Sequence, residues 1–417
     1  MIRRLALVAL LASPACSAQP QAQSQPANGD AAASGQAFVP PQPASASKPV
    51  PKNAPQDASI KNVPATAGKA NLPATAQPFT IQKIGQFEEP FGMEFLPGGG
   101  LLVTEKAGAL KLRHADGSVV TVSGVPKVEP GGQGGLLDVA IAPDFADSKY
   151  VYLTYSEPGE KGSALALARG TLATPNPARA ALQNVSVLWR SGSNGPGGQF
   201  GARVAFSPDG QYLFLSSGER QRFSPAQDPE QLLGKILRLT LDGKAAPGNP
   251  MYAEGGVRAM TWSTGHRNPY GLAFAPDGRL WETEMGPRGG DELNLIEAGK
   301  NYGWPVVSNG DNYSGQPIPD HPSKPEFEAP KLWWNPSISP GGMIIYTGDL
   351  FPQYKGSAFL AALSGQALIR VELNGATARP AEQWDMGARI RDVIQAPDGA
   401  IWLLQDDGAL DRLTPKG

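Results

Sequence analysis

The chain has 417 residues, with 36 Lys and Arg against 38 Asp and Glu, for a formal net charge of −2. This balance gives no case for nucleic acid as a partner, because nucleic-acid-binding domains usually carry a strongly basic face. The 50 glycines and 41 prolines argue against a mainly helical protein and favour short strands joined by many turns.

Residues 1–18 have the pattern of an export signal. Arg3 and Arg4 precede the apolar run LALVALLA, and small residues follow, which is the order that secretory signals share. The apolar run is too short to cross a membrane as a permanent helix. The only cysteine, Cys16, stands where a lipoprotein signal places its lipidated residue, although the expected leucine lies too far upstream. Lipidation at Cys16 and ordinary cleavage near Ala18 both remain open.

Residues 19–78 are rich in Ala, Pro, Gln, Ser and Lys and contain almost no large apolar side chains. Such a segment cannot bury enough surface to offset the entropy lost on ordering, so we predict a disordered tether. An exported protein without cysteine in its folded part tolerates an oxidising compartment without disulfides. We therefore expect a periplasmic or cell-envelope protein, held at the outer membrane if Cys16 is lipidated.

From residue 79 onwards one unit recurs, made of an apolar alternating run, a Pro-Asp-Gly-like turn and a second apolar run. Units of this kind predict β-hairpins. The copies are GMEFLPGGGLLVTE from Gly92, DVAIAPDFADSKYVYLTY from Asp138, ARVAFSPDGQYLFLSS from Ala202, GLAFAPDGRLWETE from Gly271 and DVIQAPDGAIWLLQ from Asp392.

A hairpin repeated over about 300 residues is typical of the blades of a β-propeller, in which radial repetition protects the sheet edges. A pair of β-sandwiches and a long β-helix are the alternatives, and the irregular spacing argues against the β-helix. We predict an all-β propeller over residues 79–417. Little helix is expected, and the only segment with a helical pattern is QDPEQLLGKILRL from Gln227.

One stretch, between Gly265 and Pro305, surrounds such a hairpin with polar side chains. A segment that only had to fold would not need so many charged and amide groups close together. They are His266, Arg267, Asn268, Glu284, Arg288, Asp291, Glu292 and Asn294. The strand and its turn are the scaffold, and the polar groups indicate a site.

Arginines precede two of the apolar strands. Arg389 and Arg391 lie two positions apart, so both project from the same side of an extended chain. The pair Arg267–Asn268 precedes another strand in the same way. Guanidinium groups bind planar carboxylates and quinone-like oxygens in bidentate fashion, so we expect a cationic pocket near the propeller axis. The alternative is that Arg389 and Arg391 are surface residues paired with Asp392 or Glu382.

A glycine-rich bend at Gly286 and Pro287 follows a strand, where backbone carbonyls can turn outward. Carbonyls, carboxylates and water are the ligands that Ca²⁺ prefers. Asp291, Glu292 and the region of Tyr302 offer such groups for a second, structural calcium site. The alternative is that these acidic loop residues are only solvated.

Six segments carry a family resemblance: GGQGGLLDVA, FGARVAFSPDG, GHRNPYGLAF, EMGPRGGDELNLIEAGKNYGWP, PSISPGGMIIY and IRDVIQAPDG. In this order they resemble the soluble PQQ-dependent sugar dehydrogenases, of the aldose sugar dehydrogenase or glucose/sorbosone dehydrogenase type. The third and fourth segments together are very specific. The resemblance implies a six-bladed β-propeller that holds pyrroloquinoline quinone (PQQ) and Ca²⁺ on its axis. It also implies an oxidoreductase that oxidises the C1 hydroxyl of an aldose-type sugar by hydride transfer to the quinone.

The resemblance implies that six residues contact the cofactor or border its pocket: Gln133, Arg267, Asn268, Ser337, Arg389 and Arg391. Gln133 would lie at the pocket mouth, the arginine and amide before the strand would contact the quinone, and Arg389 and Arg391 would grip the cofactor carboxylates. Ser337 would contact the cofactor through its hydroxyl.

The resemblance also assigns two calcium sites. The carbonyls of Gly286 and Pro287 would hold the Ca²⁺ that bridges to the quinone, and Glu292 with the Tyr302 carbonyl would bind the second ion. The implied partners are a small-molecule sugar and an external electron acceptor.

The chain departs from the family at the general base, a histidine four residues before a strand arginine. Here that arginine is Arg203, and the base position is Gln199. A glutamine amide cannot take a proton at neutral pH. Glu219 stands where an acidic residue orients the family's histidine, and it is the nearest candidate for a substitute base. Ser364 replaces a lysine that glucose-oxidising relatives place against the cofactor.

The three histidines do not supply the missing base. His114, in a hairpin, and His321, in a polar insert, are expected at the surface, whereas His266 is expected to pack or cap a blade. Trp333, Trp334 and Tyr346 are read either as a sugar-facing wall or as blade core.

Three functions follow from these observations. The first is an exported PQQ- and Ca²⁺-dependent sugar dehydrogenase. The second is a non-catalytic propeller that binds a cofactor or ligand, favoured by the loss of the histidine at Gln199. The third is a lactonase-type hydrolase, for which the necessary cluster of acidic and amide metal ligands cannot be assembled. The retained arginines and the calcium bend favour the dehydrogenase.

Overall fold

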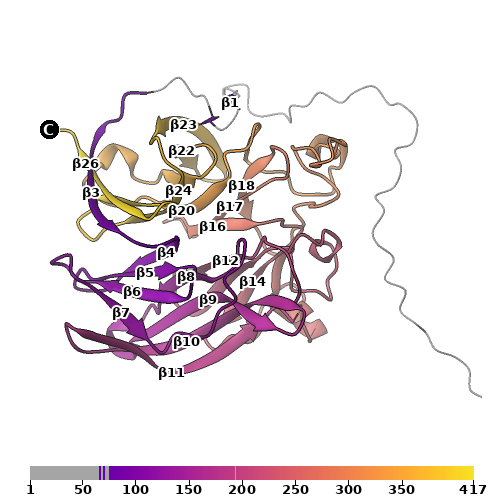
Figure 1. The fold of residues 1–417 in the computed structure, drawn as a ribbon. Helices are drawn as coiled ribbons and strands as arrows, with labels where there is room; N and C mark the ends of the chain where they lie inside the picture. Colours follow the sequence, from indigo (N-terminus) through magenta and orange to yellow (C-terminus); the bar gives the residue numbers. More distant parts are fainter. Residues whose placement is uncertain (1–64, 67–68, 71–74, 193) are drawn as a thin grey trace, which may run out of the picture. The chain divides into compact units, whose positions relative to one another are not determined.

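The computed structural model describes residues 65–66, 69–70, 75–192 and 194–417 (Figure 1). The predicted export signal with Cys16, and most of the predicted tether, lie outside these ranges. Within that segment two short strands, β1 (Ala65–Thr66) and β2 (Lys69–Ala70), pair antiparallel. None of the helices in the described ranges has the length and apolar character needed to cross a membrane.

The largest sheet has eight strands in the order β4-β5-β6-β7-β11-β10-β9-β8. It consists of two four-stranded halves, β4–β7 and β8–β11, which join through a parallel pairing of β7 with β11. The strands are β4 (Pro90–Phe95), β5 (Leu101–Glu105), β6 (Ala109–Arg113), β7 (Val119–Ser123), β8 (Leu136–Ile141), β9 (Tyr150–Gly159), β10 (Gly162–Asn176) and β11 (Arg179–Arg190).

Three further sheets each contain four consecutive strands in chain order. The first comprises β12 (Gly201–Phe206), β13 (Tyr212–Ser217), β14 (Lys235–Thr240) and β15 (Thr261–Thr264). The second comprises β16 (Pro269–Phe274), β17 (Leu280–Glu284), β18 (Asp291–Ile296) and β19 (Leu332–Trp334). The third comprises β20 (Pro340–Ile345), β21 (Ala358–Ala362), β22 (Ala367–Asn374) and β23 (Thr377–Asp385).

The last sheet joins the two ends of the fold. It comprises β24 (Ile390–Gln395), β25 (Ile401–Gln405), β26 (Ala409–Pro415) and β3 (Phe79–Gln86). β3 pairs antiparallel with β26 along its whole length, from Phe79 opposite Pro415 to Gln86 opposite Ala409. In Figure 1 the indigo β3 lies beside the yellow β26. The first strand of the fold is therefore the outer strand of its last sheet.

Helices are few and short in the described ranges. They are α1 (Phe145–Ser148) and the 3₁₀ turns η1 (Ser224–Ala226), η2 (Tyr252–Glu254), η3 (Arg258–Met260), η4 (His321–Ser323) and η5 (Pro352–Tyr354). The helix considered for QDPEQLLGKILRL is absent, and this interpretation was wrong. Its apolar end forms β14, because Ile236, Leu237 and Leu239 bury their side chains between neighbouring strands.

The innermost strands form a closed ring. β4 contacts β8, β8 contacts β12, and the contacts continue through β16, β20 and β24 back to β4. Each of these strands begins a hairpin, and all five predicted hairpins are present, at β4–β5, β8–β9, β12–β13, β16–β17 and β24–β25. This ring of radially arranged sheets confirms the all-β, propeller-like architecture.

Arg203, on β12, links the inner strands. Its Nη1 donates to Asp138 Oδ1 and its Nη2 to Asp392 Oδ1, each at 2.7 Å. Its Nε donates to the Tyr270 carbonyl at 2.8 Å, and Asp392 Oδ2 accepts the Met93 amide at 3.1 Å. All five residues are buried. One guanidinium thus ties together strands β8, β12, β16 and β24, and through Asp392 also β4.

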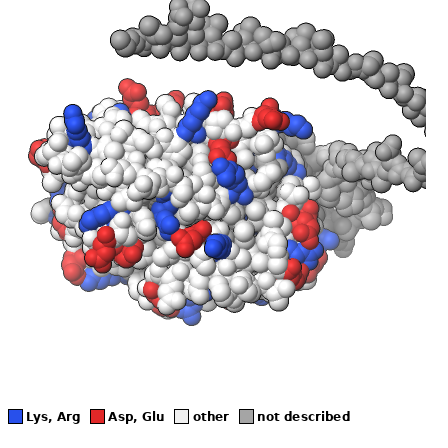
Figure 2. Space-filling model, turned by 90° about the horizontal axis from the view of Figure 1, so that it is seen from below, with Lys and Arg blue, Asp and Glu red and all other residues white. Residues whose placement is uncertain are grey.

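Charges of both signs are scattered over the face of the molecule in Figure 2. Lysines and arginines alternate there with aspartates and glutamates, and large uncharged areas separate them. This face therefore presents no extended surface of one sign.

Candidate active site

Seven of the predicted site residues share one position in the ring, at or just before the start of an inner strand, whereas Glu219 follows β13, Gly286 and Pro287 follow β17, and Glu292 and Tyr302 lie on and after β18. Gln133 precedes β8, Gln199 precedes β12, Arg267 and Asn268 precede β16, Ser337 precedes β20, and Arg389 and Arg391 flank the start of β24. Because the inner strands contact one another around the ring, their starts bring these side chains toward one end of it.

Gln133, Gln199 and Tyr270 lie in direct contact. Gln133 Oε1 accepts the Gln199 amide at 2.6 Å and the Tyr270 hydroxyl at 3.3 Å. Gln199 is buried, and its backbone has a left-handed φ of 55°. Its side-chain Oε1 accepts the Gln221 amide at 3.2 Å. The position of the family's base therefore lies inside the group of site residues, and it offers an amide.

Tyr270 connects this group to Arg391. The Phe91 ring meets the Tyr270 ring edge-on at 5.5 Å, and the Arg391 guanidinium lies 5.6 Å from the same Phe91 ring. Burial raises the pKa of Tyr270, while the Arg391 charge lowers it. Arg391 and Tyr270 thus lie against the same aromatic ring.

Arg389 and Arg391 converge on one carboxylate, Asp406. Arg389 Nε donates to Asp406 Oδ2 at 2.8 Å, and Arg391 Nη2 donates to Oδ1 at 2.5 Å. The alternative partners considered from sequence were wrong, because Asp392 pairs with Arg203, and Glu382 pairs with Arg370. The predicted convergence of the two guanidiniums is present, whereas their grip on a ligand stays a prediction.

Arg267 is buried between two aromatic rings. Its guanidinium carbon lies 5.2 Å from the Trp304 ring and 5.8 Å from the Tyr313 ring. Its Nη1 donates to the Gly286 carbonyl at 2.6 Å, and its Nη2 to the Tyr313 hydroxyl at 3.3 Å. Its Nε, also buried, has no hydrogen-bond partner. A buried donor without a partner marks a place where a bound oxygen would fit.

Asn268 links the starts of β12 and β16. Its Oδ1 accepts the Gly201 amide at 3.2 Å, and its Nδ2 lies 3.5 Å from the Met285 sulfur. Glu284 Oε2 accepts the backbone amides of Arg267 and Asn268 at 2.5 and 3.1 Å. The two predicted quinone contacts are therefore fixed by a carboxylate on the adjacent strand, β17.

Glu219 orders a strained loop beside Arg267. Its Oε2 accepts the amides of Arg222 and Phe223, both at 2.5 Å. Phe223 has φ 60° and ψ −77°, and the Ser224 amide donates back to the Arg222 carbonyl at 2.8 Å. This is the rare γ-turn geometry, which strains the backbone and is concentrated at functional sites.

The same carboxylate was the candidate substitute base. Burial raises the pKa of Glu219, while the Phe223 amide and the Arg267 charge lower it. One of its two oxygens is already engaged by the loop. A base role therefore remains a prediction that depends on the other oxygen.

Asp291 fixes the glycine-rich bend to the start of β20. Its Oδ1 accepts the Gly286 amide at 2.8 Å, and its Oδ2 accepts the Ser337 hydroxyl and the Ile338 and Ser339 amides at 2.6–2.7 Å. These four donors make Asp291 a structural anchor, and the calcium role considered for it from sequence stays a prediction.

Ser364, just after β21, contacts the same segment before β20 that Asp291 binds. Its hydroxyl lies 3.0 Å from the Ser337 carbonyl, to which it can donate, and 2.8 Å from the Ser339 hydroxyl, from which it can accept. The position that carries a lysine in glucose-oxidising relatives is thus occupied by a short side chain turned toward the backbone.

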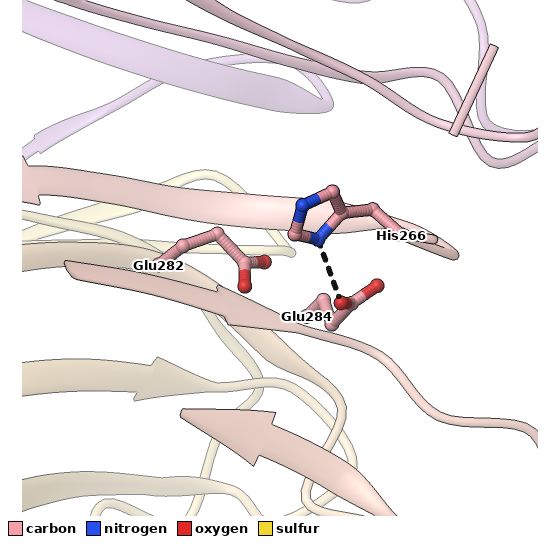
Figure 3. Close-up of side chains that lie close together, drawn as sticks. All are labelled: His266, Glu282 and Glu284. Atoms are coloured by element: carbon pink, nitrogen blue, oxygen red, sulfur yellow. Dashed lines mark hydrogen bonds and ion pairs between the residues drawn. The ribbon is translucent and has the colours of Figure 1, made fainter. Parts of the chain in front are cut away.

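His266, Glu282 and Glu284 form a buried cluster (Figure 3). His266 Nδ1 lies 3.1 Å from Glu284 Oε1, and Nε2 lies 2.8 Å from the Ser263 hydroxyl. Burial raises the pKa of Glu282 well above its ordinary value, and the Glu284 charge raises it further. His266 is buried, as expected, and its ring stacks on that of Tyr302 at 4.8 Å.

A small cavity lies next to this cluster. Its volume is about 10 Å³, the space of one water molecule or one ion. It is lined by Arg267, Glu284, Met285, Gly286, Gly290, Glu292, Tyr302, Trp304, Val307 and Ser308. It brings together Gly286, Glu292 and Tyr302 from the two predicted calcium sites. A larger cavity, of about 230 Å³, includes none of the predicted site residues in its lining.

Sequence reasoning missed the aromatic residues around Arg267. Tyr313 and Phe223 are among the few exposed large apolar side chains of the described residues, and the Phe223 ring lies 5.7 Å from Trp304. The available signal was their position in the two long segments inserted between hairpin units, residues 220–232 and 305–330. Trp334 and Tyr346, weighed as a sugar-facing wall, are buried in the sheet cores instead.

The remaining histidines differ from each other. His114 bonds the Pro177 carbonyl at 2.9 Å near the surface. His321 was expected at the surface, which was wrong, because only 2% of it is exposed. The insert that contains it folds inward over β18.

The glucose/sorbosone dehydrogenase family model matches residues 87–412. The chain belongs to this family. The aldose sugar dehydrogenase YliI of Escherichia coli (strain K12) is 40% identical over 347 residues, which cover 79% of this chain and 91% of that protein. The resemblance found from the motifs is confirmed.

Solved structures of related proteins agree with this family assignment. A glucose dehydrogenase is 42% identical with a TM-score of 0.76, over 81% of this chain and 99% of that one. The PQQ-bound aldose sugar dehydrogenase of Streptomyces coelicolor is 29% identical with a TM-score of 0.66, over 81% and 98% of the two chains. Membership of this family makes the chain a sugar dehydrogenase-like oxidoreductase.

Proposed function

We propose that this family member is an exported, PQQ- and Ca²⁺-dependent oxidoreductase that oxidises the C1 hydroxyl of an aldose-type sugar. The relative crystallised with PQQ supports the cofactor. The observation that carries the proposal is the unpartnered Nε of buried Arg267, at the end of the ring where the other predicted site residues gather. We also infer six blades, counting the eight-stranded sheet as two.

The residues present fit a planar, oxygen-rich acid. Arg267 and Asn268 would contact the quinone, and Ser337, Gln133, Arg389 and Arg391 would complete the pocket. Arg389 and Arg391 bind Asp406 in this structure, so ligand carboxylates would compete with or bridge to that pair. Their positive charge would stabilise negative charge that develops during the reaction.

Calcium fits the bend at Gly286. Its carbonyl accepts one hydrogen bond, from Arg267, and a carbonyl oxygen has two lone pairs. Gly286 and Pro287 would hold the first ion, and Glu292 with the Tyr302 carbonyl the second. When bound, PQQ would accept the hydride, and Ca²⁺ would polarise its quinone oxygen.

The sugar hydroxyl must also lose a proton. Gln199 can orient this hydroxyl through its amide but cannot accept the proton. Glu219 is the candidate acceptor, directly or through water. A general base contributes about 10²–10⁴-fold to a rate, so slow turnover is expected. For this reason a non-catalytic, cofactor-binding propeller is the second candidate.

Export places the protein in the periplasm or cell envelope, with an external electron acceptor. Cys16 would be its lipid anchor if the signal is a lipoprotein signal. Radiolabelled palmitate should label the wild type and not Cys16→Ser if this is so.

The first prediction concerns reconstitution. The purified protein, incubated with PQQ and Ca²⁺, should show a cofactor spectrum that aldoses bleach, and it should reduce a dye slowly. Gln199→His should raise turnover by about 10²-fold or more, because it restores an imidazole base. Histidine tolerates the left-handed backbone at this position better than most residues.

The outcomes separate the candidates. Tight PQQ binding without bleaching, in both the wild type and Gln199→His, would favour the non-catalytic propeller. Absence of PQQ binding would overturn the cofactor assignment. Loss of the residual activity in Glu219→Gln, with the cofactor spectrum retained, would identify Glu219 as the base.

A further inference from the structure

The two glutamines at the position of the family's base have their side-chain oxygens fixed by the main chain. Gln133 Oε1 accepts the backbone amide of Gln199 at 2.6 Å, and Gln199 Oε1 accepts the backbone amide of Gln221 at 3.2 Å. A backbone N–H can only donate, so it must face the oxygen of a side-chain amide and not the NH₂ group. The orientation of both side-chain amides follows from these two contacts.

The NH₂ groups of the two glutamines remain free for a ligand. Within the described ranges, Nε2 of Gln133 and Nε2 of Gln199 make no hydrogen bond, and neither nitrogen is sealed from solvent. Gln133 Oε1 is engaged a second time, by the Tyr270 hydroxyl at 3.3 Å. An amide NH₂ group donates and does not accept. The pair therefore presents donors where the family's histidine presents a proton acceptor.

The charged groups around this pair are mainly positive. Arg220, with 1% of its surface exposed, and Arg267 donate to backbone carbonyls and form no ion pair within the described part of the chain. The charge of Glu219 acts on both of them and on Arg222. Three guanidinium groups thus surround one carboxylate, and Tyr270 is the titratable side chain in direct contact with the pair.

We propose that Gln133 and Gln199 act as an oxyanion hole, which stabilises the C1 oxygen of the sugar after it has lost its proton. The inference rests on the proposed C1 oxidation and gives it another route for the proton. The O–H bond breaks, its electron pair stays on the oxygen, and the proton joins a hydroxide ion from solvent to form water. Donors placed where negative charge develops lower the free energy of that step, so no side-chain base is needed.

Such a site also selects the class of substrate. The ring oxygen of a cyclic aldose withdraws electrons from C1, which makes the C1 hydroxyl more acidic than the hydroxyls of a polyol. A site that stabilises the ionised hydroxyl without taking the proton depends on this acidity. We therefore expect cyclic aldoses to be oxidised and polyols to be refused.

The first test measures binding to the full chain without PQQ, so it does not depend on turnover. Gluconate has a carboxylate at C1, whereas glucose has an uncharged hydroxyl there, and calorimetry should show tighter binding of gluconate. Gln199→Met keeps an unbranched side chain without the donor. It should weaken gluconate binding about 10-fold or more, as loss of a hydrogen bond to a charged group does. Gln211→Met, at an exposed turn, is the matched control and should bind gluconate like the wild type.

The second test is the pH profile of dye reduction by the protein loaded with PQQ and Ca²⁺. The wild-type kcat/KM should rise about tenfold per pH unit between about pH 6 and 9, because hydroxide takes the proton in place of a general base. Gln199→Glu puts a carboxylate at the base position, so its kcat/KM should level off within this range. Gln211→Glu should keep the wild-type slope.

Two results would overturn the proposal. One is a wild-type kcat/KM that levels off like that of Gln199→Glu, which would identify a side-chain base such as Glu219. The other is gluconate binding that Gln199→Met leaves unchanged; if this variant does not fold, Gln133→Met, at an exposed position, replaces it. Gluconate binding that depends on Gln199, without PQQ binding or dye reduction, would support the oxyanion hole and overturn the dehydrogenase function instead.

Discussion

Arg203 illustrates how much of the ring depends on single buried side chains. It faces two buried aspartates, and the pairing offsets the cost of removing three charges from water. From the sequence, Arg203 could be recognised only as the arginine at the start of a strand that the family shares. The two partners, Asp138 and Asp392, are 65 and 189 residues away. Nothing local in the sequence indicates such distant contacts.

Arg203→Ala should destabilise the protein by about 3–5 kcal/mol, because it leaves both aspartates buried and unpaired. Urea unfolding followed by circular dichroism measures the change. Arg190→Ala is the control, since Arg190 forms its ion pair with Glu157 while 54% of its side chain is exposed. That variant should lose less than about 1 kcal/mol. Similar losses in both variants would contradict the role given to Arg203.

Glu94, on β4, predicts a dependence of stability on pH. Burial and the charges of Asp138 and Asp392 raise its pKa from 4.5 to about 8. Between these two values the folded state binds more protons than the unfolded state, so stability falls as pH rises.

Glu94→Gln stays neutral and should lack this component of the fall. Its advantage over the wild type in free energy of unfolding should grow to about 2 kcal/mol by pH 8, a value reduced for solvent screening of a half-buried group. Unfolding curves at several pH values between 5 and 8.5 measure this growth. An advantage that does not change with pH would contradict the raised pKa.

At the scale of elements, the hairpins could be predicted because their information is local. Alternating apolar residues and Pro-Asp-Gly turns define the first two strands of each unit. The outer strands could not be placed in the same way. β14 shows why, since its apolar residues follow a charged, helix-compatible segment, and only burial between neighbouring strands decides its conformation.

The site was predictable only as a set of residue types. Family motifs identified Gln133, Gln199, Arg267 and Gly286, and the structure shows a contact between the first two and another between the last two. They could not indicate that Asp406 binds both Arg389 and Arg391. Asp406 follows β25, and only the pairing of β25 with β24 brings it to the two arginines. The burial of His321 depends on how a long insert folds back, which no local pattern records.

Asp291 links two segments of the fold, because its carboxylate fixes both the Gly286 bend and the turn before β20. Asp291→Ala should cost about 3 kcal/mol or more, since several buried donors lose a charged acceptor. It should also weaken Ca²⁺ binding at the bend. Unfolding and calorimetry report the two effects. Asp209→Ala, which removes a carboxylate from an exposed turn, is the control, and it should change neither quantity appreciably.

At the scale of the whole molecule, ring closure depends on β3. A protein lacking residues 1–74 should unfold like the wild type, because the strands of the ring begin later. A protein lacking residues 1–86 should fail to form a cooperative fold, because β26 then lacks its partner along the whole edge. Thermal unfolding of the two variants distinguishes them. Equal melting temperatures would show that closure through β3 is dispensable.

The pairing of Phe79 with Pro415 means that the fold has no intrinsic beginning. Its two ends lie side by side in one sheet, so a short peptide could join them, and a new break could be made in a loop elsewhere on the circle. Circular permutants opened at the exposed turn between β22 and β23, for example, would keep every neighbour around the ring. The order in which the gene encodes the sheets is therefore separable from the architecture, and the predicted export signal could precede another sheet.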